Sequence, residues 1–379
     1  MAEAAIQGFT QDRFASVRKP FEDNFASGAD VGASFCATVN GETVADLWGG
    51  YADGARTRPW AKDSIINVYS TTKTMTALTA LLVADRGELD FDAPVARYWP
   101  EFAANGKADV KVSHLMSHSS GLSGWKEKIS AEDLYDGEKM TSLLAAQAPF
   151  WKPGTASGYH AITQGYLVGE VVRRITGRSL GTVFRDEIAR PLGADFHIGL
   201  PASEDSRVAE LIPPEPGTAI GDGTQTELQA NMSGNPGVDV SATRTRAWRG
   251  AEIPAAGGTG NARSIAEIHA ILANGGMAKG KRIMSEAGCR KALEPQIEGT
   301  DLILGVPIKF GLGFGLPGSM IPLPSPNSMF WGGYGGSLTV IDFDKRATFG
   351  YAMNRMVGTT TGDPRAFGMI MAMYQTLAS

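Results

Sequence analysis

The sequence predicts a fold of α/β plus all-α class, in which an antiparallel sheet flanked by helices carries a helical insertion. Strand signals occur near both ends of the chain, and helical signals fill the middle. The chain has 379 residues, 43% of them hydrophobic and 20% charged, so it can bury a large core. We expect residues 1–90 and about 255–379 to form one discontinuous α/β domain, with residues from about 91 to 254 as a mostly helical insertion. A cleft between the two is the natural place for a site.

The first elements are expected to be a helix and a hairpin. Residues 10–26 have amphipathic helical spacing, with Phe14, Val17 and Phe21 on one side. The stretches VGASFCATV and TVADLWGGYAD are rich in β-branched and aromatic residues and flank NGE. Because Asn-Gly favours a tight hairpin turn, the two stretches should pair as antiparallel strands.

A core helix and a helical region should follow. Residues 75–83 are apolar on nearly every face, and Gly87 after them favours a left-handed helix end. Helical patterns such as QGYLVGEVVRRITG and GTVFRDEIARPLG dominate residues 92–220. Residues 213–260 are dense in Gly, Pro, Thr and Asn, which predicts a loop-rich zone.

Strand signals return near the C-terminus. The segment SIAEIHAILANGG predicts a helix, and GSLTVIDFD and ATFGYAMN flank DKR as a second hairpin. The segment DPRAFGMIMAMYQTLA has the spacing of an amphipathic closing helix. Sheet segments at both ends therefore belong to one domain.

Charge and cysteine content exclude several classes of protein. The net charge is -5 and the basic residues are scattered, so no nucleic-acid partner is expected. Cys36 and Cys289 are the two cysteines and should be buried reduced thiols. The first residues lack the pattern of an export signal, and no apolar run approaches the length of a membrane span. We expect a cytoplasmic protein with no membrane partner.

Ser70 and Lys73 stand three residues apart at the start of the predicted core helix. Residues at this spacing share a helix face, so the amine can reach the hydroxyl. Desolvation by the apolar helix would lower the pKa of the lysine toward the range of a base, and the helix N-terminus would stabilise an oxyanion. The pattern is typical of an acyl-transfer nucleophile. A chance match, with a capping serine and a lysine that reaches solvent, is the alternative.

Several motifs in order support the catalytic interpretation. The run INVYSTTKTMTALTALLVADRGELDFDAPVARYWPEF, followed by VKVSHLMSHSSGL, resembles the serine β-lactamase and penicillin-binding protein superfamily, on its class C β-lactamase and family VIII carboxylesterase side. WKPGTASGYHAITQGYLVGEVV, ITGRSLGTVFRDEIARPLGA and FWGGYGGSLTVIDFDKRATFGYAMN match as well. The resemblance extends from about residue 31 to the C-terminus and implies a β-lactamase-like fold.

The resemblance assigns roles to individual residues. Ser70 matches the acylated serine, Lys73 the lysine of S-x-x-K, and Tyr159 the tyrosine of Y-x-N, which exchanges protons with the nucleophile and leaving group. A neighbouring lysinium would favour the phenolate of Tyr159 and make it a general base. A packed aromatic after a Gly-rich turn is the alternative for this tyrosine.

The third motif departs from the β-lactamases. Where they have K-T-G, this chain has Trp331, Gly332 and Gly333, as in family VIII esterases. The glycines would let substrate approach the strand, and the N–H groups of Tyr334 and Ser70 would form the oxyanion hole. Glycines packed against another backbone are the alternative. The family's Asn is also replaced, by Ala161.

These departures remove the groups that hold β-lactams and favour neutral esters. We therefore predict a serine carboxylesterase acting on small to medium neutral esters, with no metal and no organic cofactor. The alternatives are a β-lactamase or D-amino-peptide hydrolase, an acyltransferase, and a non-catalytic interaction module. The substrate would be a small-molecule ester, and the oligomeric state is not predicted.

Three other patterns have simpler interpretations. GRSLG, residues 177–181, matches the nucleophile elbow of α/β-hydrolases, but Ser179 lies between two predicted helices, where a capping role is expected. His114 and His118 have a zinc-like spacing without a third ligand, so hydrogen-bonding roles are expected. His160 should point away from the face of Tyr159, because adjacent side chains of an extended segment alternate, although it could line the pocket rim.

Aromatic side chains should wall the substrate pocket. Trp331 is the strongest candidate, and Trp125 and Tyr135 are the others, with His160 at the rim. Trp151 and Phe314 are at least as consistent with core packing.

Overall fold

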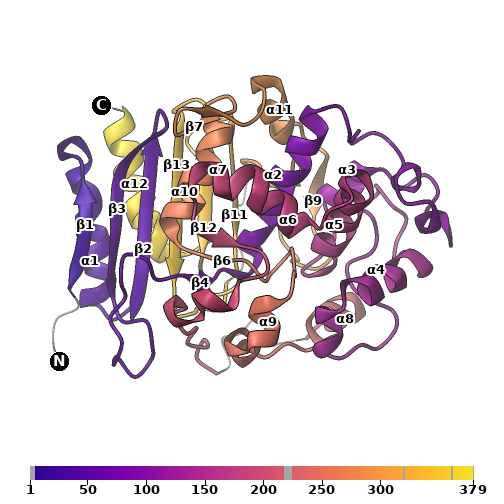
Figure 1. The fold of residues 1–379 in the computed structure, drawn as a ribbon, viewed down its shortest axis with the longest axis horizontal. Coiled ribbons are helices and arrows are strands. Elements are labelled where there is room, and N and C mark those ends of the chain that lie inside the picture. Colours follow the sequence, from indigo (N-terminus) through magenta and orange to yellow (C-terminus); the bar gives the residue numbers. More distant parts are fainter. Residues whose placement is uncertain (1–4, 217–223, 319–320, 360–361, 379) are drawn as a thin grey trace.

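The computed structural model describes residues 5–216, 224–318, 321–359 and 362–378. Its main sheet has six strands in the order β1-β3-β2-β13-β12-β11, and every neighbouring pair is antiparallel (Figure 1). The strands are β1 (Ile6–Thr10), β2 (Gly32–Val39), β3 (Glu42–Gly50), β11 (Ser328–Gly332), β12 (Leu338–Asp342) and β13 (Ala347–Met353). Strands from the two ends of the chain therefore share one antiparallel sheet, as predicted.

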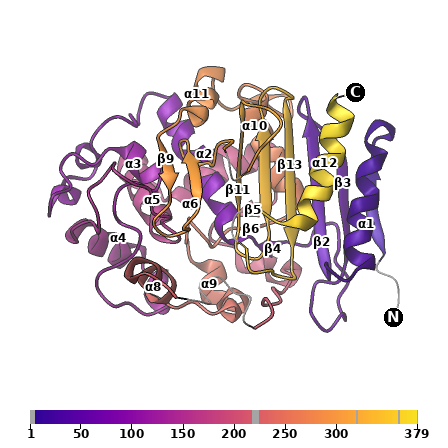
Figure 2. The same ribbon diagram turned by 180° about the vertical axis from the view of Figure 1, so that it is seen from behind.

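Helices cover both faces of this sheet. Helix α10 (Ala262–Ala273) crosses the face seen in Figure 1, whereas α12 (Pro364–Ala378) lies on the opposite face, seen in Figure 2, with α1 (Arg18–Ala26) beside it. Ten of the twelve residues of α10 are buried. The sheet is therefore the centre of a layered core.

A helical region adjoins the sheet on the side of β11 (Figure 1). Its helices and the remaining short helices are α3 (Val112–Met116), α4 (Gly137–Ala146), α5 (Thr163–Thr176), α6 (Leu180–Phe184), α7 (Arg190–Leu192), α8 (Glu227–Gly234), α9 (Arg246–Gly250) and α11 (Glu286–Arg290). The short strands are β4 (Ile66–Asn67), β5 (Phe196–His197), β6 (Thr259–Gly260), β7 (Met277–Ala278), β8 (Lys281–Arg282), β9 (Ile297–Thr300) and β10 (Pro307–Phe310).

Helix α2 (Thr72–Asp85) is the core helix that the sequence predicts. Its first twelve residues are all buried, so each of its faces packs against protein. The chain leaves the helix through Gly87, whose φ of 76° is the left-handed value expected of a helix end.

Two local predictions need correction. Residues 10–26 are not one helix: Thr10 ends β1, residues Asp12–Val17 form 3-10 turns, and α1 begins at Arg18. Phe14, Val17 and Phe21 are buried as expected, but the short edge strand β1 has too little alternation to predict. Helices α8 and α9 lie in the zone predicted as loop-rich, of which residues 217–223 lie outside the described residues.

The first hairpin turn follows its sequence signal. Asn40 and Gly41 both have positive φ, 53° and 81°, as a type I′ turn requires. Cys36 on β2 and Cys289 on α11 are both free and buried, as predicted.

Candidate active site

Ser70 lies in a 3-10 turn, Tyr69–Thr71, directly before α2, and not in the helix as its spacing suggested. Its side chain is buried. Tyr69 before it has a φ of 41°, in the left-handed region that bulky residues avoid. Such strain persists only where surrounding contacts hold the backbone, and here the Tyr69 N–H donates to the Asn67 side chain at 3.2 Å. The nucleophile candidate therefore sits on a sharply turned, fixed backbone.

Lys73, in the first turn of α2, is completely buried, with 0% of its surface exposed. Its Nζ lies 3.0 Å from the Oγ of Ser70, 2.6 Å from the carbonyl oxygen of Ala161 and 3.0 Å from that of Ala255. Burial places the pKa of Lys73 well below its usual 10.5, because a charged amine loses its hydration there. A neutral amine has two N–H groups for the two carbonyls and one lone pair, which leaves the lone pair for the Ser70 hydroxyl.

Tyr159 lies beside this pair, with the centre of its ring 4.8 Å from Lys73 Nζ. Burial raises the pKa of Tyr159, and the nearby Ser70 hydroxyl and Trp331 indole only partly oppose that increase. Its hydroxyl has no partner within hydrogen-bonding geometry among the described residues. Both shifts oppose the expected pairing of a phenolate with a lysinium, because burial raises the pKa of Tyr159 and lowers that of Lys73.

Asp301, which was not predicted from the sequence, fixes the backbone that carries Tyr159. One carboxylate oxygen accepts the N–H groups of Tyr159, Ile303 and Leu304 at 3.0, 2.9 and 2.9 Å. The second oxygen is buried without a partner in the described part of the chain. No motif marks this aspartate, since its partner Tyr159 is 142 positions earlier in the chain.

Trp331 lies on β11 and packs against Tyr159, with ring centres 5.4 Å apart. Gly332 ends the strand and is buried. A side chain on Gly333 would overlap the carbonyl oxygen of Val68 and the Oγ of Ser337. The alternative interpretation of Gly333 is therefore supported, because its lack of a side chain allows close contact with the chain's own backbone.

The loop after Gly333 is attached to the nucleophile segment. The Oγ of Ser337 donates to the Val68 carbonyl at 2.8 Å and lies 2.9 Å from the hydroxyl of Thr71. The rings of Tyr334 and Tyr69 are in edge contact at 5.6 Å. Tyr334 is thus held beside the residue that precedes Ser70.

The other two predicted pocket walls, Trp125 and Tyr135, make contacts within the helical region. Trp125 is buried in the helical region, where its indole N–H donates to the Met140 carbonyl at 3.1 Å. Tyr135 lines a separate groove of about 890 Å³, and the described residues around that groove include none of the predicted catalytic residues. These contacts lend no support to the two placements, which stay predictions, because pocket walls depend on loop conformation, which composition does not specify.

His160 is a structural residue and not part of a pocket rim. It is fully buried, and its Nε2 accepts the Leu122 N–H at 3.2 Å and contacts the Ser120 hydroxyl at 2.8 Å. Its Nδ1 is hydrogen-bonded to the carbonyl oxygen of Gly158. Burial lowers the pKa of His160 to about 3, so the ring is neutral. These bonds hold the ring against Ser120, Leu122 and Gly158.

His118 and His114 also use their rings within the protein. His118 is buried, and its Nδ1 accepts the N–H of His160 at 3.0 Å. Its ring lies 4.8 Å from the ring of Tyr159 and 4.9 Å from that of Phe310. His114 accepts a backbone N–H from Lys111. The hydrogen-bonding interpretation of both histidines is confirmed, and His118 additionally packs behind Tyr159.

Ser179 is a helix cap, as predicted. It precedes α6, its Oγ accepts the Thr182 N–H, and it donates to Glu252 at 2.7 Å. It follows α5 and not a strand, so GRSLG is no nucleophile elbow. Phe314 is a core residue and Trp151 is half-buried, with its indole bonded to the Ala156 carbonyl.

An antiparallel sheet with an adjoining helical region, together with a buried serine, lysine and tyrosine in mutual contact, is the arrangement of the serine β-lactamase-like class of proteins. The Beta-lactamase family model matches residues 20–369, and the chain belongs to that family.

Individual relatives are esterases and penicillin-binding protein homologues by name. Esterase/beta-lactamase LipL of Mycobacterium tuberculosis is 36% identical over 367 residues, 93% of this chain and 83% of LipL. The crystal structure of a family VIII carboxylesterase is 44% identical, with a TM-score of 0.94 over 98% of this chain and 100% of that one. A penicillin-binding protein homologue from Caulobacter crescentus is 37% identical, with a TM-score of 0.91 over 98% and 100% of the chains.

Over the residues that the structure describes, we find no helix both long and apolar enough to cross a membrane.

Proposed function

We propose that this protein is a serine carboxylesterase that hydrolyses small to medium neutral esters through an acyl-enzyme on Ser70. The contact of Lys73 Nζ with Ser70 Oγ, at 3.0 Å, carries the proposal. The two carbonyl partners orient the amine, and burial favours its neutral form. A fixed neutral amine beside a hydroxyl is the arrangement that activates a serine nucleophile.

Acylation uses the side chains of Ser70, Lys73 and Tyr159 in sequence. The Oγ of Ser70 attacks the ester carbonyl carbon while its proton moves to Lys73 Nζ. Tyr159 donates its phenolic proton to the leaving alkoxide and regains a proton from the Lys73 ammonium. Deacylation reverses the roles: Lys73 takes a proton from water as the water attacks the acyl carbon, and Tyr159 donates its phenolic proton to the departing Oγ of Ser70 and regains one from the Lys73 ammonium.

The N–H groups of Ser70 and Tyr334 would stabilise the oxyanion. The position of Tyr334, in contact with Tyr69, supports this assignment, as does the tight packing of Gly333 on the Val68 carbonyl. Two backbone donors aimed at one point would stabilise a tetrahedral intermediate without reorganisation. No metal or organic cofactor enters these steps.

The residues around the site favour a neutral ester. Trp331 offers an indole where a K-T-G lysine would offer a cation, and Ala161 has no side-chain amide. The Ala161 carbonyl is already bonded to Lys73. The family VIII carboxylesterase and the esterase EstB of Burkholderia gladioli, the latter 32% identical over 181 residues, support this choice. LipL is named for both esterase and beta-lactamase activity.

The domain division and location follow the same proposal. Residues 1–90 and about 255–379 would form one domain and the residues between them the insertion, with Ser70 near their junction. The substrate would be a small-molecule ester, and the site of action would be the cytoplasm.

A panel of p-nitrophenyl esters of increasing chain length, assayed beside nitrocefin, tests the proposal. We expect short esters to be turned over faster than nitrocefin, and Ser70→Ala to lose activity by about a thousandfold or more. Faster turnover of nitrocefin would favour the β-lactamase alternative. Acyl transfer to an added alcohol in preference to water would favour an acyltransferase, and no turnover would favour a non-catalytic module.

A further inference from the structure

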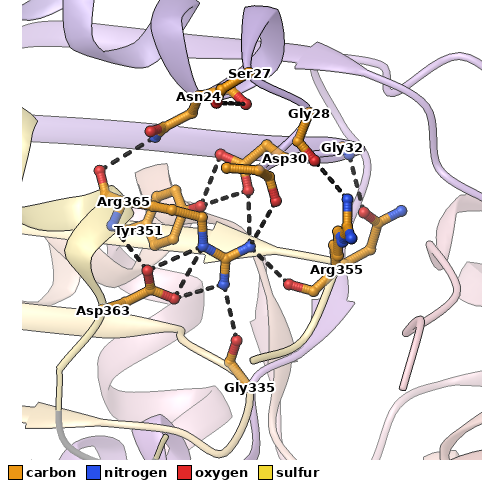
Figure 3. Close-up of polar contacts among 12 residues, drawn as sticks. Asn24, Ser27, Gly28, Asp30, Gly32, Gly335, Tyr351, Arg355, Asp363 and Arg365 are labelled. Atoms are coloured by element: carbon orange, nitrogen blue, oxygen red, sulfur yellow. Dashed lines mark hydrogen bonds and ion pairs between the residues drawn. The ribbon is translucent and has the colours of Figure 1, made fainter. Parts of the chain in front are cut away.

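Arg365, near the start of α12, is a buried charged residue outside the catalytic cluster. Only 7% of its surface is exposed, and its guanidinium lies between two fully buried carboxylates (Figure 3). Its Nη1 donates to Asp30 at 3.0 Å, and its Nε donates to Asp363 at 2.9 Å. The carboxylates hold the planar guanidinium in one orientation, as bidentate pairing does elsewhere.

Arg365 also donates to backbone carbonyls. Its Nη1 donates to the carbonyl of Arg355 at 2.7 Å, and its Nη2 donates to the carbonyl of Gly335 at 3.0 Å (Figure 3). Gly335 directly follows Tyr334. The peptide carbonyl held by the guanidinium is therefore one residue from the N–H assigned to the oxyanion hole.

Two glycines with unusual backbone angles, Gly335 and Gly336, form the turn at this contact. Gly335 has a φ of 98° and Gly336 a φ of 127°, values that L side chains rarely adopt. A side chain on Gly336 would overlap Asp363. Two glycines have little conformational preference of their own, so neighbouring contacts must fix the turn.

Contacts fix the loop from both sides. On one side Ser337 donates to the Val68 carbonyl, in the segment that leads to Ser70. On the other side Arg365 and the N–H of Val357, at 3.0 Å, both donate to the Gly335 carbonyl. Tyr334 lies between these two anchors.

We propose that Arg365 is a positioning residue for the oxyanion hole, which orients the Tyr334 N–H by holding the Gly335 carbonyl. This inference rests on the proposed esterase function. Asp363 orients the guanidinium, whereas Asp30 and Tyr351 complete its surroundings without touching the loop. Arg365 thus connects helix α12 to the oxyanion hole through the carbonyl group of Gly335.

Arg365→Lys and Arg365→Gln test the proposal, with Tyr351→Phe as the matched control. Arg365→Lys keeps the positive charge but lacks the planar guanidinium, which donates to the Gly335 carbonyl and to both carboxylates at the same time. The Tyr351 hydroxyl donates to Asp30 at 2.7 Å, so its loss disturbs the same buried cluster without removing a bond to the loop. Asp363→Asn provides a milder variant that keeps Arg365, in case the arginine variants do not fold.

The measurement compares a p-nitrophenyl ester with its thiono analogue, whose sulfur accepts hydrogen bonds poorly. We expect Arg365→Lys to lower kcat on the ester about tenfold to a hundredfold, with KM changed by less than about threefold. The ratio of kcat/KM for ester over thiono ester should fall at least about threefold. Asp363→Asn should lower the ratio less, and Tyr351→Phe should leave it at the parent value.

Each outcome decides between the two proposals. An unchanged ratio in folded Arg365→Lys or Asp363→Asn, whatever the melting temperature, means that Arg365 only stabilises the fold, and the inference fails while the esterase proposal stands. A fall of the ratio in Tyr351→Phe equal to that in Arg365→Lys also overturns the inference. If the parent forms no acyl adduct on Ser70 with the ester, the proposed function fails, and the inference fails with it.

Discussion

Lys73 Nζ lies 3.0 Å from Ser70 Oγ, and its other two hydrogen-bonding directions are taken by backbone carbonyls. The amine is therefore oriented by the main chain and does not depend on a mobile side-chain partner. Burial makes the charged form costly, so the pKa of Lys73 lies well below its usual 10.5 and the shift favours the form that can act as a base.

Replacement of Lys73 should separate its chemical role from its packing. Lys73→Met fills a similar volume without a base, and we expect kcat/KM on p-nitrophenyl butyrate to fall by about a thousandfold or more. Circular dichroism and the melting temperature check that the variant is folded. Retention of more than a tenth of the parent activity by folded Lys73→Met would contradict the role of the amine as base.

The pH profile should report the neutral amine. Protonation of Lys73 removes its lone pair, so kcat/KM should decrease as the pH falls through the pKa of Lys73, which burial places well below 10.5. Tyr159→Phe should keep this acid limb while losing rate, because the limb belongs to Lys73. A profile in which Tyr159→Phe abolishes the acid limb would assign the base to the phenol.

The same pKa shift affects stability. The folded chain has the lower pKa, so between that value and 10.5 the unfolded chain binds the extra proton, and stability from Lys73 rises with pH. The free energy of unfolding of the parent, measured relative to Lys73→Met by denaturant titration, should therefore increase toward high pH. If the difference in the free energy of unfolding between the two proteins did not change with pH, the pKa of Lys73 would not be lowered in the folded state.

Asp301 should act through the backbone of Tyr159. Asp301→Ala leaves three buried N–H groups without an acceptor and should cost about 2–4 kcal/mol of stability and lower kcat. Asp301→Asn keeps an oxygen that can accept these bonds, so its kcat should stay within about threefold of the parent. Equal losses of kcat in both variants would instead indicate that the charge of Asp301 matters.

Gly333 should tolerate no side chain. Gly333→Ala places a methyl group against the Val68 carbonyl, so we expect a loss of at least about 2 kcal/mol of stability together with a lower kcat. Gly137→Ala is the control, because its added methyl group meets nothing within 4 Å. A melting temperature of Gly333→Ala equal to that of Gly137→Ala would show that the loop shifts without cost.

The sequence predicted elements whose patterns are strong and local. The buried helix after Ser70 and the Asn40–Gly41 turn follow from apolar runs and backbone preference, and both are present. The edge strand β1 was missed because its five residues carry almost no alternation, and pairing with β3 stabilises it from outside.

The site was predictable where motifs mark it and not where long-range contacts build it. Ser70 and Lys73 are three residues apart, so helix geometry alone brings them together. Asp301 and Arg365 act on residues 142 and 30 positions away, and no spacing rule connects them. The neutral state of Tyr159 also depends on burial, which only the folded structure supplies.

The most direct test of the proposed mechanism is peptide mapping by mass spectrometry of the protein quenched during turnover of p-nitrophenyl butyrate. We expect a butyryl group on Ser70 in the parent, and no adduct in Ser70→Ala. An adduct on Ser179, or ester turnover that leaves Ser70 unmodified under conditions where p-nitrophenol is released in a burst, would contradict the acyl-enzyme on Ser70.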